Sequence, residues 1–170
     1  QTINHLIDYR YFDLHVFTDR PAADIGVDNI SARNKQTFYF DFYSPERADR
    51  FILIDKKKYD VVFLGSANSY RSNRLEFIEF LKNNLQNFKT FFSISERKNQ
   101  VNEKEHDLIL SQAKIGLNFS FSVDKHQLKG RAIYTMLSGA LLLESKNNQI
   151  THFFKNGEDF VFFDNKNDLL

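Results

Sequence analysis

The segment KGRAIYTMLSGALLLE, residues 129–144, decides the fold class of this chain. Its first twelve residues, 129–140, place apolar side chains at the spacing of one helical face, namely Ile133, Met136, Leu137 and Ala140. Gly139 is a helix stop, because glycine adopts the left-handed cap conformation without a steric penalty. The apolar run that follows, 140–143, is typical of a strand buried on both faces of a parallel sheet. The segment therefore predicts a short helix, a glycine stop and a buried strand.

The opposite face of this predicted helix is polar, and its residues are Arg131, Tyr134, Thr135 and Ser138. Basic residues also gather at its N-terminal end, where the helix dipole is already positive: Lys125, His126, Lys129 and Arg131. A bound anion would turn this repulsion into attraction, because free backbone N–H groups and the dipole both favour phosphate. Two interpretations stay open here, an anion site and a solvated basic loop.

Composition narrows the class of protein. A chain of 170 residues suits one domain and is long enough to bury a core. The net charge of +1 gives no bulk attraction to nucleic acid, and no run of about 18 apolar residues predicts a transmembrane helix. The absence of cysteine excludes disulfides and zinc–thiolate sites in this chain and fits a cytoplasmic setting. Because it opens at Gln1 and stops where the pattern predicts the start of a new helix, we expect a fragment of a longer polypeptide.

Strands and helices alternate from residue 59 onward. Strands are predicted at 60–64, 89–94, 115–122, 140–143 and 160–163, and helices at 73–85, 103–113, 129–138 and 149–154. Such alternation indicates βαβ units, and therefore a parallel sheet with helices on both faces. The preceding part is less regular, with short strands predicted at 14–17 and 37–40 and a solvated linker at 56–58.

Ligands of such sheets bind at the carboxyl ends of the strands. The candidates there are the loop 65–74, which opens on Gly65 and Ser66 and carries Arg71 and Arg74; the strand end with Ser120 and Ser122; the basic entrance 125–131; and the segment 144–149, which begins with Glu144. Arginine can grip phosphate oxygens in a two-point fork. Two basic loops and a polar strand end at one edge suggest an anionic, nucleotide-like ligand, with generic surface arginines as the alternative.

Several catalytic and binding motifs are missing from the chain. It has no G-x-G-x-x-G dinucleotide fingerprint, no G-x-x-x-x-G-K-[ST] loop and no G-x-S-x-G nucleophile elbow. Its five histidines show no metal-ligand spacing, and no Asp-x-Asp pair is present to hold a metal–diphosphate. No metal site and no resident cofactor are expected.

The order and spacing of four pieces resemble the glycosyltransferase group 1 superfamily, in particular its spore-maturation-type branch. These pieces are KIGLNFS at 114–120, KGR at 129–131, LSGALLLE at 137–144 and FFKNGEDFV at 153–161. The resemblance covers roughly 59–170. It implies an α/β, Rossmann-like, donor-binding domain at 59–170, the C-terminal half of a GT-B fold, truncated at its C terminus. Residues 1–58 would then be a remnant of the acceptor-side half or a linker to it.

The resemblance also implies a function and a set of roles. Such enzymes bind a nucleotide-diphosphate sugar without a metal and transfer the sugar to an acceptor, here unknown, with a separate N-terminal Rossmann-like half completing the cleft. The residues expected at the donor diphosphate are Arg71, Arg74, Lys129 and Arg131. The residues expected near the nucleoside or sugar are Gly65, Ser66, Ser120, Ser122, Tyr134, Ser138 and Glu144.

One position departs from the family pattern. A glutamate that holds the ribose hydroxyls usually stands where this chain has Tyr134, and the earlier glutamate of a Glu-x7-Glu pattern would fall at His126. A tyrosine hydroxyl can hydrogen-bond to ribose, but it cannot offer two charged acceptor oxygens. The alternative function is therefore a binding module that keeps the fold and has lost transfer activity.

Overall fold

The computed structural model of the chain describes residues 14–17, 36–39, 51–66, 72–94, 101–120, 128–147 and 149–170. Near the N terminus, β1 (Leu14–Phe17) and β2 (Gln36–Tyr39) pair in parallel. The strand predicted at 14–17 is confirmed, and the one predicted at 37–40 lies one residue earlier.

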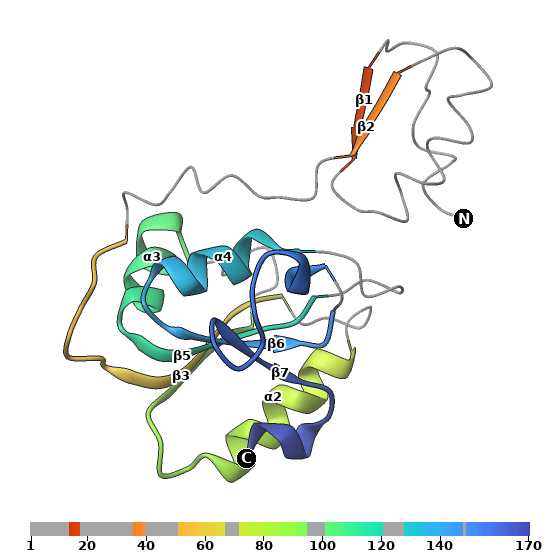
Figure 1. Ribbon diagram of the computed structural model, residues 1–170. Coiled ribbons are helices and arrows are strands. Elements are labelled where there is room, and N and C mark those ends of the chain that lie inside the picture. The colour runs from red at the N-terminus through yellow and green to blue at the C-terminus, as the bar shows by residue number, and fades with distance from the viewer. Residues whose placement is uncertain are drawn as a thin grey trace.

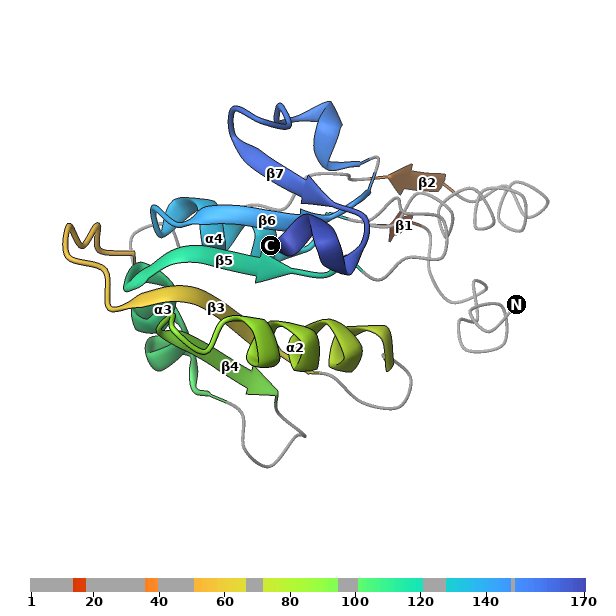
Figure 2. The same ribbon diagram turned by 90° about the horizontal axis from the view of Figure 1, so that it is seen from below.

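Five parallel strands form the main sheet, in the order β4-β3-β5-β6-β7 (Figure 2). Their bounds are Tyr59–Gly65 for β3, Thr90–Ile94 for β4, Ala113–Asn118 for β5, Leu141–Ser145 for β6 and Phe160–Phe163 for β7. The predicted strand at 115–122 therefore begins earlier, at Ala113, whose partner is Tyr59, and ends at Asn118. The predicted α/β, Rossmann-like architecture is confirmed.

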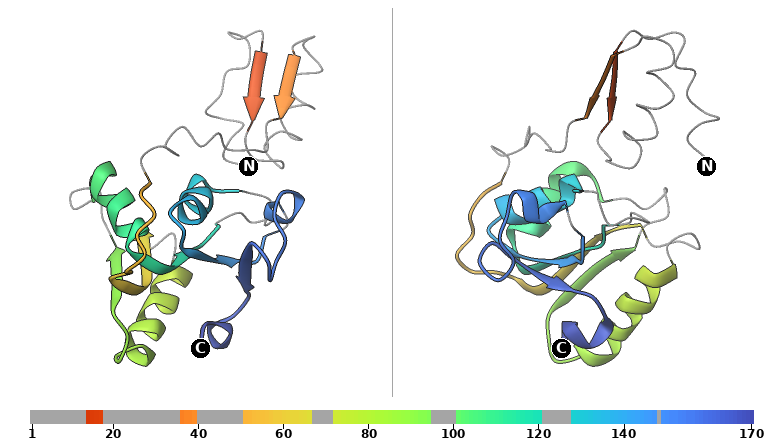
Figure 3. Two further views of the ribbon diagram at one scale, coloured as in Figure 1. Left: turned by 60° about the vertical axis from the view of Figure 1, so that its left-hand side comes forward. Right: turned by 45° about the vertical axis from the view of Figure 1, so that its right-hand side comes forward.

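Helices cover both faces of this sheet, as the alternation predicted. On one face lies α2 (Ser72–Asn84), and on the other lie α3 (Glu103–Ser111) and α4 (Gly130–Leu137) (Figure 1). Two short 3₁₀ turns complete the chain, η6 (Ile150–His152) and η7 (Lys166–Leu169). The second lies beside α2 (Figure 3), where Lys166 Nζ is 3.0 Å from an oxygen of Glu76.

The core follows the two-residue period of the strands. Phe63 of β3 points to the α2 face and packs with Ile78 and Leu81, together with Leu117 from β5. Its neighbours in β3 point to the other face, where Val62 and Leu64 pack with residues of α3 such as Ile109 and Leu110. One strand thus supplies apolar side chains to both layers, as expected for a central parallel strand.

The buried face of α4 differs from the predicted one. Thr135 is 1% and Ser138 0% exposed, whereas Met136 and Leu137 are only partly buried. The reason is a close approach: a Cβ built on Gly116 of β5 would lie 2.4 Å from Cγ2 of Thr135. A glycine under a small β-branched residue lets the helix rest directly on the sheet. The predicted stop is confirmed, since Gly139 has φ +70°.

The strand after this helix is also less buried than predicted. Leu142 and Glu144 of β6 are fully buried on the α4 side, but Leu141 on the other side is 43% exposed. On that side α2 lies over β3 and leaves the start of β6 uncovered (Figure 2). The continuous apolar run was therefore a poor guide to burial on both faces.

The predicted solvated linker at 56–58 contains a structural lysine. Lys57 Nζ donates to the backbone oxygens of Ser111, at 2.9 Å, and Ser138, at 3.3 Å. These two carbonyls lie at the C-terminal ends of α3 and α4, where a positive charge also opposes the negative end of each helix dipole. Lys57 therefore joins the two helices that cover one face of the sheet.

Candidate functional site

The topology locates the place where a ligand would bind. From β3 the chain crosses through α2 to β4 on one side, and it then returns through α3 to β5 on the other side of β3. The connections that leave β3 and β5 therefore run to opposite faces of the sheet. In open parallel sheets this switch point leaves a crevice outside the carboxyl ends of the two strands. Here that edge presents Gly65 and Ser66 at the end of β3, and residues 118–120 at the end of β5.

Arg131, in the first turn of α4, reaches this switch point. Its Nη1 donates to Oδ1 of Asn118 at 3.2 Å, and its guanidinium lies 5.6 Å from the ring centroid of Phe63. A Cβ built on Gly65 would be 2.9 Å from the same Nη1. The glycine at the end of β3 thus makes room for the guanidinium, so the predicted residues Gly65 and Arg131 do come together.

A hollow of about 240 Å³ opens beside this guanidinium. Its polar lining comes from Ser66, Ser93, His106 and Arg131. Nδ1 of His106 lies 3.3 Å from Oδ1 of Asp107, a residue only 3% exposed. The volume is below the range of roughly 300–1,000 Å³ typical of drug-sized ligands, so it suits one part of a larger ligand, such as a phosphate or a heterocycle.

Behind the guanidinium, Asn118 joins Arg131 to Glu144. Asn118 Nδ2 donates to Glu144 Oε2 at 2.6 Å, and both residues are fully buried. Burial raises the pKa of Glu144 from 4.5 to about 7, against the opposing effects of hydrogen bonding from Ser120 and Asn118 and of the charge on Arg131. Its other oxygen, Oε1, makes no hydrogen bond of good geometry to the described residues. Glu144 therefore belongs to this edge, as predicted, but it lies behind Arg131.

The ionisation of Glu144 makes folding stability depend on pH. The pKa of Glu144 is about 7 in the folded chain and 4.5 in the unfolded chain, so the folded chain binds the proton more tightly than the unfolded chain does. The free energy of unfolding therefore falls as pH rises from 4.5 to about 7. At about 1.4 kcal/mol per pH unit the total fall is on the order of 3 kcal/mol. We expect Glu144→Gln to abolish this fall. Urea denaturation of both proteins between pH 5 and pH 8 measures it, and a constant difference between them would contradict the expectation.

Arg74, another of the three arginines predicted at the diphosphate, is 4% exposed at the start of α2. Its Nη1 donates to the backbone oxygen of Ser66 at 3.0 Å and its Nη2 to that of Phe119 at 2.8 Å. It therefore ties together the two strand ends on either side of the switch point. Contact of Arg74 with a diphosphate stays a prediction, while its role in holding the two strand ends together is established by these bonds.

Of the other predicted residues, some lie near this edge and some lie outside the described part of the chain. Ser120 lies at the same edge, where its backbone N–H donates to Oγ of Ser145 at 2.9 Å. Lys129 is the N-cap residue of α4 and makes no side-chain capping bond there. Arg71 and Ser122 lie outside the described residues.

Tyr134 and Ser138 lie further along α4 than Arg131, and the proximity of Tyr134 to a nucleoside stays a prediction. The ring of Tyr134 packs against Phe51, with centroids 6.0 Å apart. Ser138 follows α4 at its far end, near the start of β6, and its hydroxyl donates to the backbone oxygen of Thr135 at 2.6 Å. The structure therefore does not bring Ser138 to the edge where Arg131 lies.

Asn118 is the residue of this edge that the motifs missed. The alternation in 115–122 nevertheless indicated it, because Gly116, Asn118 and Ser120 share the small, polar face of that predicted strand. The packing of Thr135 on Gly116 confirms that this face is turned toward α4. An asparagine at the carboxyl end of such a face lies within reach of the first turn of α4.

Residues 54–170, well over half of the chain, match a protein family described as glycosyl transferase-like. The chain belongs to the glycosyl transferase-like family. The family match spans the whole main sheet and includes Arg131, Asn118 and Glu144. No curated protein matches the chain at a significant level.

Two further findings concern the described part of this glycosyl transferase-like chain. None of the helices described is both long and apolar enough to span a bilayer. Among the same residues, no three side chains of histidine, aspartate or glutamate gather in a way that could hold a metal ion.

Proposed function

We propose that this domain binds a nucleotide-diphosphate sugar at the carboxyl edge of its sheet and transfers the sugar to an acceptor. The observation that carries the proposal is the position of Arg131, a partly buried cation held at the switch point beside a polar hollow. Membership of the glycosyl transferase-like family supports glycosyl transfer in general. A nucleotide diphosphate is the anionic leaving group that such a site would favour.

The chemistry that this edge could perform is electrostatic. Transfer breaks the bond between the anomeric carbon of the sugar and the diphosphate oxygen, which keeps the electron pair. It forms a bond from that carbon to the acceptor, whose proton would pass to a base of the acceptor-side half. The guanidinium of Arg131 would donate hydrogen bonds to the diphosphate oxygens that gain negative charge, in surroundings drier than bulk water. Lys129, at the N-cap of the same helix, adds positive charge nearby, and Arg71 is a further candidate. Positive side chains would then take the place of a metal ion.

The acceptor-binding part of the enzyme would lie outside this domain. The acceptor and the groups that activate it would come from a separate N-terminal Rossmann-like half, as in a GT-B enzyme of the spore-maturation type. Gly65, Ser66 and Ser120 would lie nearest the nucleotide sugar, since they stand at the same edge as Arg131. A cytoplasmic location remains part of the proposal.

One observation favours the second candidate, a binding module without transfer activity. Tyr134 replaces the carboxylate that related enzymes use for the ribose hydroxyls, and its ring packs on Phe51. A domain of this kind would bind the nucleotide sugar weakly and release it unchanged. The two candidates therefore differ in turnover.

Calorimetric titration of the domain with UDP, GDP and their sugar conjugates tests the proposal. We expect the diphosphates to bind more tightly than the free nucleosides, and a chelator to leave the affinity unchanged. Release of free sugar or transfer to added acceptors, followed by chromatography, separates the enzyme from the binding module. Equal or absent binding of diphosphates and nucleosides would overturn the proposal.

A further inference from the structure

The hydrogen bonds behind Arg131 run in one direction only. A guanidinium has donors and no acceptor, so Oδ1 of Asn118 must face Arg131. The amide nitrogen of Asn118 then faces Glu144, and this nitrogen can only donate, so it needs an acceptor there. Glu144 supplies that acceptor at 2.6 Å. The carboxyl group therefore orients the amide, and the amide orients the guanidinium.

Two features show that this chain of contacts is more than packing. Glu144 is fully buried, and its Oε1 has no hydrogen bond of good geometry to the described residues, although Ser120 lies close enough to favour the ionised form. A buried carboxyl in such a place changes charge near neutral pH, because burial raises its pKa to about 7. A charge that appears one amide group away from the guanidinium alters the potential at the anion site.

We propose that Asn118 and Glu144 are positioning residues for Arg131, and that ionisation of Glu144 weakens the binding of an anionic ligand at the carboxyl edge of the sheet. This inference rests on the proposed function for the identity of the ligand, a nucleotide-diphosphate sugar. The neutral carboxyl group orients Asn118 without offsetting the charge on Arg131. The ionised carboxylate orients it equally well but neutralises part of the attraction for the diphosphate.

Arg131 of α4 is the charged group whose field lowers the pKa of Glu144. Asn118 at the end of β5 and Ser120 just after it contribute uncharged side chains, and β7 places Phe162 at the paired position. His106 of α3 lines the same hollow as Arg131 and is a second ionisable side chain there. A pH experiment must therefore separate the effect of Glu144 from any effect of His106.

The first experiment needs no ligand. The carboxyl carbon of Glu144 is followed by NMR through a pH titration of the wild type, Arg131→Gln and Lys82→Gln. Loss of the Arg131 charge is expected to raise the pKa of Glu144, because that charge favours the carboxylate. Lys82 is an exposed residue in the last turn of α2, and its loss should leave the titration unchanged. A Glu144 titration unaffected by Arg131→Gln would overturn the coupling.

The second experiment measures affinity for UDP-glucose between pH 6 and pH 8.5, an interval in which its diphosphate diester keeps a constant charge. We expect the wild type to bind about fivefold more weakly at the upper end. Glu144→Gln should show a flatter profile, and His106→Gln should keep the decline that comes from Glu144. Parallel profiles for the wild type and Glu144→Gln would overturn the inference.

Reciprocity gives a test that needs no variant, in case Glu144→Gln does not fold. If ionisation of Glu144 weakens binding, then bound UDP-glucose must raise the pKa of Glu144 by the same coupling. The NMR titration of the wild type with and without UDP-glucose measures this directly, and an unchanged pKa would contradict the inference. Absence of any binding would refute the proposed ligand, while the ligand-free titration would still decide the coupling of Glu144 to Arg131.

Discussion

Replacing Arg131 by alanine is expected to weaken the binding of UDP and its sugar conjugates about tenfold to a hundredfold. The reason is that hydrogen bonds from a charged donor contribute about 1.5–3 kcal/mol. The guanidinium is also held in advance, by Asn118 on one side and the ring of Phe63 on the other, so little entropy is lost when an anion binds. Titration calorimetry at pH 6, where Glu144 is mainly neutral, measures the effect.

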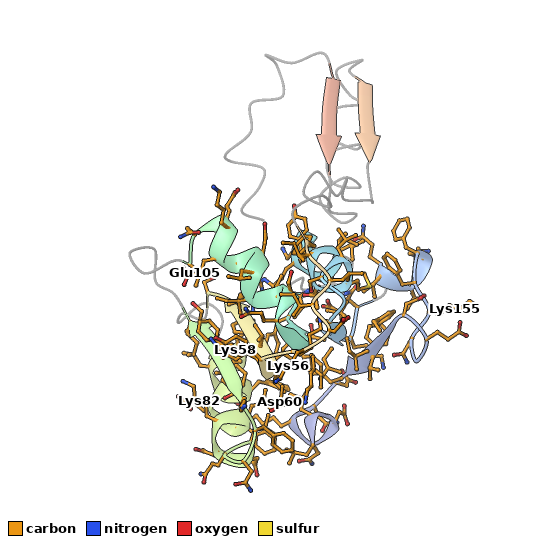
Figure 4. All side chains as sticks on the ribbon, turned by 90° about the vertical axis from the view of Figure 1, so that its left-hand side faces the viewer. Lys56, Lys58, Asp60, Lys82, Glu105 and Lys155 are labelled. Carbon is orange, nitrogen blue, oxygen red and sulfur yellow. The ribbon has the colours of Figure 1, made fainter. Side chains whose placement is uncertain are left out.

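Two variants serve as controls for this loss. Arg131→Lys keeps the positive charge but loses the planar two-point fork, so an intermediate affinity is expected. Lys82→Gln removes one positive charge from the last turn of α2. Figure 4 shows Lys82 well apart from Glu105, which marks helix α3. Lys82→Gln should bind as the wild type does. If Arg131→Ala bound as tightly as Lys82→Gln, the anion site would have to be placed elsewhere.

Replacing Arg74 by methionine is expected to lower the free energy of unfolding by about 3–5 kcal/mol, because a charged donor to two carbonyls is lost. The variant leaves the backbone oxygens of Ser66 and Phe119 without their donor in a largely buried place. Methionine fills much of the same volume, so the measured change would report mainly these bonds and not a cavity. Urea denaturation followed by circular dichroism measures the difference.

Arg74→Lys is the matched variant for this second prediction. It retains the charge, but one ammonium cannot reach both strand ends in the geometry of the guanidinium, so we expect about half of the loss. A change of less than about 0.5 kcal/mol in Arg74→Met, the size typical of a surface substitution, would show that the two carbonyls find other donors. If Arg74→Lys folds but loses UDP binding, the predicted diphosphate contact of Arg74 would gain direct support.

Much of the fold could be predicted because its signals are local. Gly139 stops α4 through its own backbone conformation, and the order of strands and helices follows from the periods of apolar residues along the chain. Element boundaries were less accurate: the helix predicted at 103–113 ends at Ser111, because pairing with β3 draws Ala113 into β5. Hydrogen bonding between distant strands, which no local pattern contains, sets that boundary.

The candidate site was only partly predictable for the same reason. Residues at strand ends could be assigned to one edge of the sheet, so Gly65, Arg131 and Glu144 were expected together. The different roles of Arg74 and Arg131 could not be predicted from sequence, since each residue follows a strand and stands at the start of a helix. Their different roles come from depth: Arg74 is buried against backbone carbonyls, while Arg131 is partly exposed beside a hollow.

The amino-acid sequence by itself determined the class of fold, the direction of the chain through it and the edge at which polar residues gather, because these depend on periodicity and on the rules of parallel sheets. Only the tertiary structure decided which of those residues act together. Asn118 meets Glu144 across 26 residues because the two are paired positions of β5 and β6, and it meets Arg131 across 13 residues because Gly116 lets α4 rest directly on β5. Such contacts between residues far apart in sequence depend on packing at the scale of single methyl groups, which the pattern of polar and apolar residues does not record.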